Sequence, residues 1–174
     1  MGLDMYLTKR KYIWSDERSK LKITGLKEKI DGSKVKELAF DAGYWRKANA
    51  IHKWFEDNCA GDDWHGGDVY VSKKDMQTLL NLCKEVVAKA KVVKGKVQNN
   101  STLTPDGWQP IMEDGEYIEN AEEIAKILPT TDGFFFGSTD YDQWYLKDIK
   151  DTIEILEKAI ADPDSGEYYY SASW

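Results

Sequence analysis

The chain is poor in the residue types that build the commonest catalytic and metal centres. Its 174 residues include two cysteines and two histidines, and no CxxC pair. A zinc site built on thiolates is therefore not expected, because such sites need several Cys and His ligands at set spacings. The motifs of serine hydrolases, dinucleotide-binding folds and phosphate-binding loops are also absent. These absences favour a non-enzymatic protein without a cofactor.

Long apolar segments are missing as well. No run approaches the roughly 20 apolar residues of a membrane span. The first residues, MGLDMYL, alternate between apolar and polar side chains instead of forming an apolar leader. We therefore expect a cytoplasmic protein with no membrane partner. The content of 41% hydrophobic residues supports a core, and the length predicts a single domain over 1–174.

Charge is divided unevenly along the chain. Residues 1–103 carry 20 Lys/Arg and 14 Asp/Glu, whereas residues 104–174 carry 4 and 17. The net charge of −7 disfavours direct DNA binding, because contact with phosphates needs a basic face. The acidic part is either a solvated surface or a contact surface for a basic partner, such as the nucleic-acid groove of another protein.

The patterning predicts an α+β fold, with about four helices packed on a small, mostly antiparallel sheet. Strands are expected near 3–8, 69–71 and 167–171, and a hairpin over 26–40 around an Asp-Gly turn. Helices are expected at 44–58, capped by Asp41; at 73–90, with a capping box from Ser72 to Asp75; and at 121–128. Residues 91–117 read as a loop-rich segment.

The stretch GFFFGSTDYDQWY at 133–145 predicts a short buried strand, a glycine turn and a helix that continues to Pro163. A helix N-terminus offers free N–H groups to an anion, which makes this joint a candidate binding site. Two aspartates already place negative charge there and would repel a phosphate, so the residues are more typical of a helix cap provided by Ser138, Thr139 or Asp140. The candidate residues are Ser138, Thr139, Asp140, Tyr141 and Asp142.

A second candidate is the run Tyr44, Trp45, Arg46 and Lys47. Two aromatic rings and two cations at a helix start can stack on a nucleotide base, or can be a core aromatic pair beside solvated cations. Arg46 is one of only three arginines, and Asp140 or Asp142 is its expected partner. A pocket shared by this run and residues 138–142 would favour ligand binding.

A third, weaker candidate is a metal site in the glycine-rich loop 61–68. One imidazole and three carboxylates in this loop are ligand types for a divalent cation, although their spacing matches neither the calcium loop of an EF-hand nor the HExxH motif. The residues are Asp62, Asp63, His65 and Asp68.

Three blocks carry a resemblance to a known group of proteins. MGLDMYL at 1–7, YWRKANAIHKWF at 44–55 and GFFFGSTDYD at 133–142 resemble a family of small proteins of bacteriophages and prophages. The blocks are distinctive and span most of the chain. The family has no assigned catalytic residues to carry over, so the resemblance implies a phage accessory protein in the bacterial host cytoplasm.

Two functions are compatible with these features. The first is a non-enzymatic binding protein that inhibits a host defence system by contacting a host protein through its acidic and aromatic surface. The second is a pocket protein for a small nucleotide or phosphate ester, or a metal-dependent hydrolase that acts on one. The lack of a complete catalytic constellation favours the first.

Overall fold

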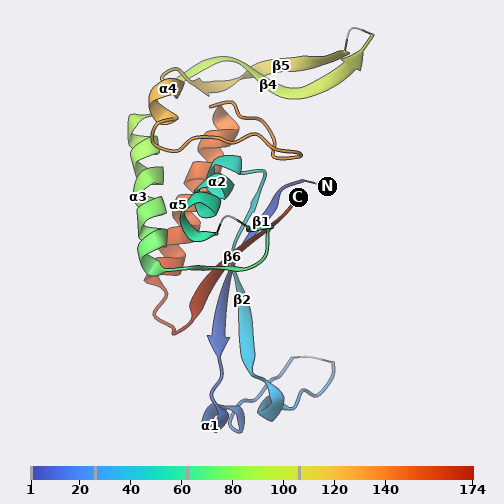
Figure 1. The fold of residues 1–174 in the computed structure, drawn as a ribbon, viewed down its shortest axis with the longest axis vertical. Helices are drawn as coiled ribbons and strands as arrows, with labels where there is room; N and C mark the ends of the chain where they lie inside the picture. The colour runs from blue at the N-terminus through green and yellow to red at the C-terminus, as the bar shows by residue number, and fades with distance from the viewer. Residues whose placement is uncertain (1, 26, 62, 106) are drawn as a thin grey trace.

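The computed structural model describes residues 2–25, 27–61, 63–105 and 107–174, apart from the side chain of Trp108. A four-stranded antiparallel sheet forms its centre, with the strand order β2-β1-β6-β3. The strands are β1 Asp4–Tyr12, β2 Glu37–Arg46, β3 Val69–Val71 and β6 Glu167–Ser173. The expected strands at the two ends of the chain and at 69–71 are therefore confirmed, and the N- and C-terminal strands lie side by side (Figure 1).

The sheet has one covered face and one open face. Met5 and Leu7 are alternate residues of β1 and are fully buried. Leu3, which continues the same alternation just before the strand, is also fully buried. They pack against the apolar sides of α2 Asn49–Cys59, α3 Lys73–Lys89 and α5 Gln143–Ala161, which lie together on one side (Figure 1). Burial of these apolar stripes drives the packing of the two layers. The opposite face exposes tyrosines, including Tyr6 and Tyr44.

The predicted boundaries of α3 and α5 are close to the observed ones. Ser72 and Asp75 form the expected capping box, with the Asp75 amide 3.1 Å from the Ser72 hydroxyl. Cys83 is buried on the inner face of α3. α5 ends at Ala161, just before Asp162-Pro163. Of the short helix predicted at 121–128, α4 covers Ala121–Ile124 only.

The described residues contain five α-helices rather than about four, because α1 Ser15–Arg18, a single turn, was not predicted. α1 belongs to an arm, residues 13–36, which projects from the far end of β1 and β2 (Figure 1). The hairpin predicted over 26–40 is wrong. Asp31 accepts a hydrogen bond from the Ser33 amide and caps the short 3-10 helix η1 Gly32–Lys34, and β2 pairs with β1 instead.

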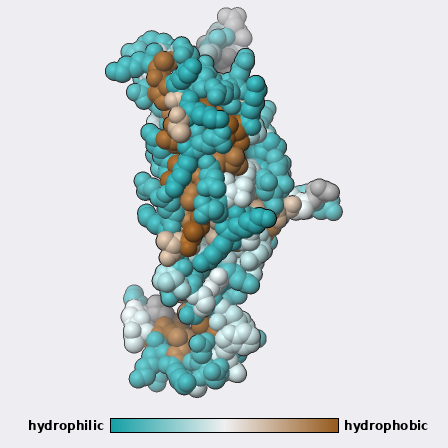
Figure 2. Space-filling model, turned by 90° about the vertical axis from the view of Figure 1, so that its left-hand side faces the viewer, coloured by the Kyte–Doolittle hydropathy of each residue, from teal (hydrophilic) through white to brown (hydrophobic). Residues whose placement is uncertain are grey.

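Residues 91–117 are not a loop-rich segment. They form most of a long antiparallel ribbon, β4 Val92–Thr104 with β5 Gly107–Ile118, that crosses the top of the molecule (Figure 1). An isolated ribbon buries little side-chain area on either face, so its strands lack the apolar alternation that identifies a half-buried strand. The surface over the α3 side of the body is mixed, with hydrophobic residues between hydrophilic ones (Figure 2).

Candidate functional site

Tyr44, Trp45 and Arg46 end strand β2 and do not begin a helix. The helix predicted at 44–58 starts at Asn49, and Asp41 lies within β2. Pairing with β1 decides this, because Tyr44 lies opposite Tyr6 and Trp45 opposite Met5. Lys47 has a φ of 60°, in the left-handed region that non-glycine residues seldom adopt, and it turns the chain from strand into helix.

The two aromatic residues of this run do not share a site. The Tyr44 ring is exposed on the open sheet face, where its hydroxyl donates to Asp4 Oδ1 at 2.5 Å. That hydrogen bond raises the pKa of Tyr44. Trp45 is buried, and its Nε1 donates to Thr152 Oγ1 at 2.9 Å. Trp45 is therefore a core residue.

The predicted buried strand at 134–136 is wrong. The segment is a turn in which the Phe134 side chain is 78% exposed and Phe136 is buried. Phe135 and Gly137 both have positive φ, at 68° and 92°, so the backbone cannot extend into a strand here.

Asn49 holds this turn against the start of α2. It is buried, and its side-chain amide donates to the carbonyl oxygens of Phe136, at 3.3 Å, and Ser138, at 2.7 Å. Its Oδ1 accepts from the Thr131 amide at 3.3 Å. One buried side chain thus joins two segments that lie more than 80 residues apart in the sequence.

Asp142, rather than Ser138, Thr139 or Asp140, caps helix α5. Its Oδ1 accepts from the amides of Trp144 at 2.8 Å and Tyr145 at 3.1 Å. The other predicted residues stabilise the preceding turn. Ser138 Oγ accepts from the Asp140 amide, the Thr139 carbonyl accepts from Thr130 Oγ1, and the Tyr141 hydroxyl accepts from the Thr130 amide.

The turn, the start of α2 and the start of α5 enclose a cavity of about 420 Å³, named here the α2–α5 cavity. Five predicted residues line it, and Tyr44, Trp45, Thr139 and Tyr141 do not. The five are Arg46, Lys47, Ser138, Asp140 and Asp142, and the residues that sequence reasoning missed include Asn49, Gln98, Asn99, Trp144, Lys147 and Asp148.

The cavity wall contains an acceptor atom that has no partner. Asp142 is 3% exposed, and its Oδ2 makes no hydrogen bond to any residue that the structure describes. Desolvation raises the pKa of Asp142, against the opposing effect of the two helix amides that bind Oδ1. A buried oxygen of this kind is costly unless a donor reaches it.

A second carboxyl on the same wall is also perturbed. Desolvation raises the pKa of Asp148 to about 7, while Lys147 lowers it and the nearby negative charges of Asp151 and Asp142 add to the increase. Asp148 therefore titrates near neutral pH. The predicted ion pair of Arg46 with Asp140 or Asp142 is not found among the described residues.

The predicted metal site has no support from the described part of the loop. Asp62 lies outside the described residues. Asp68 forms an ion pair with Arg10, and no group of three His, Cys, Asp or Glu side chains across the described residues is placed to hold a metal ion.

Asn49 and Asp148 were within reach of sequence reasoning. A polar Asn at the start of an otherwise apolar helix face, and an Asp one turn beyond Trp144, are both visible in the sequence. The burial of Asn49 depends on its contacts with the turn at 133–138, whose path the sequence did not indicate.

Searches against protein-family models, curated proteins and solved structures found no match. Among the described residues, no helix combines the length and the apolar composition that crossing a membrane requires.

Proposed function

We propose that the protein is a non-enzymatic binding protein whose α2–α5 cavity holds a small nucleotide. The observation that carries this proposal is Asp142, a residue of the cavity wall whose buried Oδ2 has no hydrogen-bond partner among the described residues. A ligand with N–H donors would satisfy it, and the amino and imino groups of a nucleobase are donors of this kind.

The remaining wall fits the other parts of a nucleotide. Trp144 lines the cavity with 49% of its side chain exposed, so its ring is available to stack on a base. Arg46 and Lys47 add positive charge to the wall for a phosphate group. A wall with charges of both signs suits a ligand that has a donor-rich base and an anionic end.

The resemblance to phage proteins supplies a setting for this binding. In a phage-infected bacterium, a protein that sequesters a signalling nucleotide would inhibit a host defence system that depends on the signal. This role needs binding and no catalysis.

The test is a thermal-shift and calorimetry screen of mono-, cyclic and dinucleotides, with and without Mg²⁺. A nucleotide present at 100 times its Kd adds about 2.7 kcal/mol of stability, which raises the Tm by about 5–10 °C for a chain of this size. Asp142→Asn should abolish the shift while the helix cap survives, since Asn caps helices as well as Asp does. Glu154→Gln, an exposed change on the same helix, is the matched control. If no nucleotide shifts the parent, the proposal fails.

A phosphate-ester hydrolase is the second candidate, favoured by the pKa of Asp148 near 7, which suits a general acid or base. Incubation of each binding nucleotide with the protein, followed by chromatography, separates the two. If the nucleotide is recovered unchanged, the protein binds it without hydrolysis. If a product forms with the parent and does not form with Asp148→Asn, the protein is a hydrolase.

A host protein remains the other proposed partner. The open sheet face supports it, because Tyr6 and Tyr44 form an exposed pair with ring centroids 5.3 Å apart, and Arg10 lies over the ring of Tyr169. Tyr and Arg are enriched in protein interfaces. A partner captured by the parent and lost with Tyr6→Ser/Tyr44→Ser would identify this face, and capture unaffected by that double change would exclude it.

A further inference from the structure

A larger cavity, of about 590 Å³, lies where the arm meets the body and is named here the arm cavity. The surface narrows at this junction, and hydrophobic residues lie on the arm below it (Figure 2). The arm lies at the opposite end of the molecule from the β4–β5 ribbon (Figure 1). The walls of the cavity come from the arm, the end of β1, the first part of β2, the end of α5 and the start of β6.

The arm cavity has a mainly apolar wall. Ile13 and Ala159 are buried, Leu21 and Leu38 are half-buried, and Phe40 exposes 47% of its side chain. An exposed phenylalanine beside buried apolar groups leaves apolar area in water, and a ligand that covers it gains free energy.

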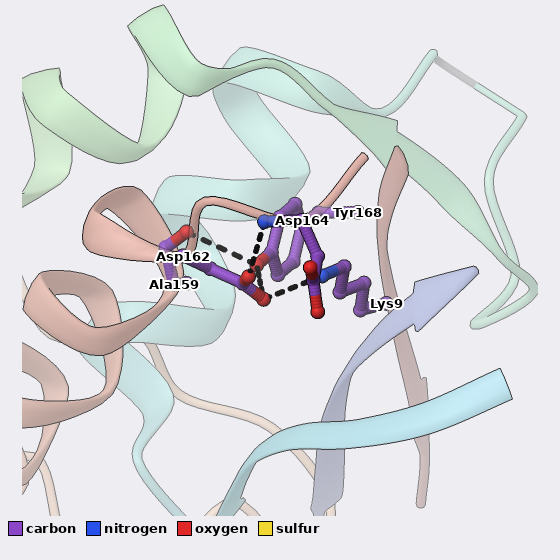
Figure 3. Close-up of polar contacts among 5 residues, drawn as sticks. All are labelled: Lys9, Ala159, Asp162, Asp164 and Tyr168. Carbon is purple, nitrogen blue, oxygen red and sulfur yellow. Dashed lines mark hydrogen bonds and ion pairs between the residues drawn. The ribbon is translucent and has the colours of Figure 1, made fainter. Parts of the chain in front are cut away.

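A buried charge lies on the same wall. Lys9 is 6% exposed, and its Nζ donates to Asp162 Oδ2 at 2.6 Å (Figure 3). An ammonium group has three N–H donors, and this is the one hydrogen bond that Lys9 Nζ makes to the described residues. Two donors of a buried cation are therefore free to bind an acceptor.

Both oxygens of the Asp162 carboxylate already accept hydrogen bonds. Its Oδ1 accepts from the Asp164 amide at 2.9 Å, and its Oδ2 lies 3.2 Å from the Tyr168 hydroxyl as well as close to Lys9 (Figure 3). The hydrogen bond from Lys9 is the main cause of the lowered pKa of Asp162, which keeps it ionised. Asp162 thus balances one positive charge, and both of its oxygens are occupied by donors of the protein.

The interior of the cavity has a surplus of positive charge. Lys9 is buried and Lys11 half-buried, whereas Asp162 is the one acidic residue of comparable depth among the described lining residues. The other acidic residues of the wall are exposed to solvent, where water screens them: Glu17, Asp41 and Asp164.

We propose that the arm cavity binds a fatty acid, with its carboxylate on Lys9 and its alkyl chain along Ile13, Leu38 and Phe40. The cavity volume falls in the range of small-molecule sites, roughly 300–1,000 Å³. A carboxylate supplies the acceptors that the Lys9 ammonium lacks, and an alkyl chain covers the apolar wall. This site is separate from the α2–α5 cavity and does not depend on the nucleotide proposal.

The test is calorimetry with straight-chain octanoate, decanoate and dodecanoate below their micelle concentrations, and with dodecanol. Affinity should rise about fourfold per added methylene, because each buried CH₂ contributes about 0.8 kcal/mol. Dodecanol, which lacks the charge, should bind at least about tenfold more weakly than dodecanoate. Equal affinity for the two, or no binding of dodecanoate, overturns the proposal.

Three variants locate the site. Lys9→Met should weaken dodecanoate binding at least about tenfold, the loss expected for a hydrogen bond to a charged group. Because Lys9→Met also leaves Asp162 without its partner, Phe40→Asp is the second variant. Its position is exposed, so the fold should survive while dodecanoate binding is lost. Lys53→Met, which removes a surface lysine paired with Asp57, is the control and should bind as the parent does. Unchanged binding by Phe40→Asp overturns the assignment of this cavity.

Discussion

His52 predicts a measurable pH dependence of stability. Its side chain is 1% exposed, and its Nδ1 lies 2.9 Å from the Tyr170 hydroxyl. Three further aromatic rings surround it, those of Trp64, Phe136 and Trp174. Desolvation lowers its pKa to about 4 from an ordinary value of 6.5, because the imidazolium form has lost its water.

The direction of this pH dependence follows from whether the folded or the unfolded state binds the proton first. The folded pKa of His52 is lower than the unfolded one, so the unfolded chain takes up the proton as the pH falls below 6.5. His52 therefore lowers the free energy of unfolding progressively between pH 6.5 and 4. The loss at pH 5, relative to pH 7.5, is about 2 kcal/mol for this pair of pKa values.

Asp148 acts in the opposite direction over the same range. Its folded pKa, about 7, is above its ordinary value of 3.8, so the folded state binds the proton first and gains stability as the pH falls. The parent protein should therefore show a shallow pH profile. A variant is needed to expose the contribution of His52.

The assay is urea unfolding at pH 7.5 and at pH 5, followed by the fluorescence of the seven tryptophans. His52→Gln removes the titrating group and retains an acceptor and donor for Tyr170. On going from pH 7.5 to pH 5, the free energy of unfolding of His52→Gln should rise by about 2 kcal/mol relative to that of the parent. His65→Gln, at the exposed second histidine, is the control and should follow the parent. A difference between His52→Gln and the parent that stays constant with pH would refute the reasoning.

Three further predictions concern individual polar side chains. Thr152→Val should cost about 1–3 kcal/mol by urea unfolding, because it leaves the buried Nε1 of Trp45 without its acceptor; equal stability would mean that water replaces the contact. Asn49→Ala should destabilise the protein by a similar amount and also abolish nucleotide binding, measured by calorimetry, because the turn at 133–138 is released; retained binding would separate the turn from the site. Ser72→Ala should lower the free energy of unfolding by about 1 kcal/mol through loss of the α3 cap, whereas Ser72→Thr, which keeps the hydroxyl, should retain most of the stability.

The long helices were predictable because their signals are local. α3 combines a Ser72–Asp75 capping box with an apolar stripe, and α5 combines a similar stripe with a stop before Pro163. The terminal strands β1 and β6 also show their period of two, since one face is buried and the other is not. The amino-acid sequence by itself therefore determined the α+β class and most of the core.

The tertiary structure decided the elements whose partners are distant in sequence. Residues 44–46 have helix-compatible spacing, yet pairing with β1 makes them a strand, and the ribbon β4–β5 lacks a buried face to mark it. The two cavities also depend on contacts between segments that are distant in sequence. Asp142 Oδ2, which has no partner in the described part of the chain, and the buried Lys9 both lie where separate segments meet. Side-chain periodicity within one segment carries no information about such contacts.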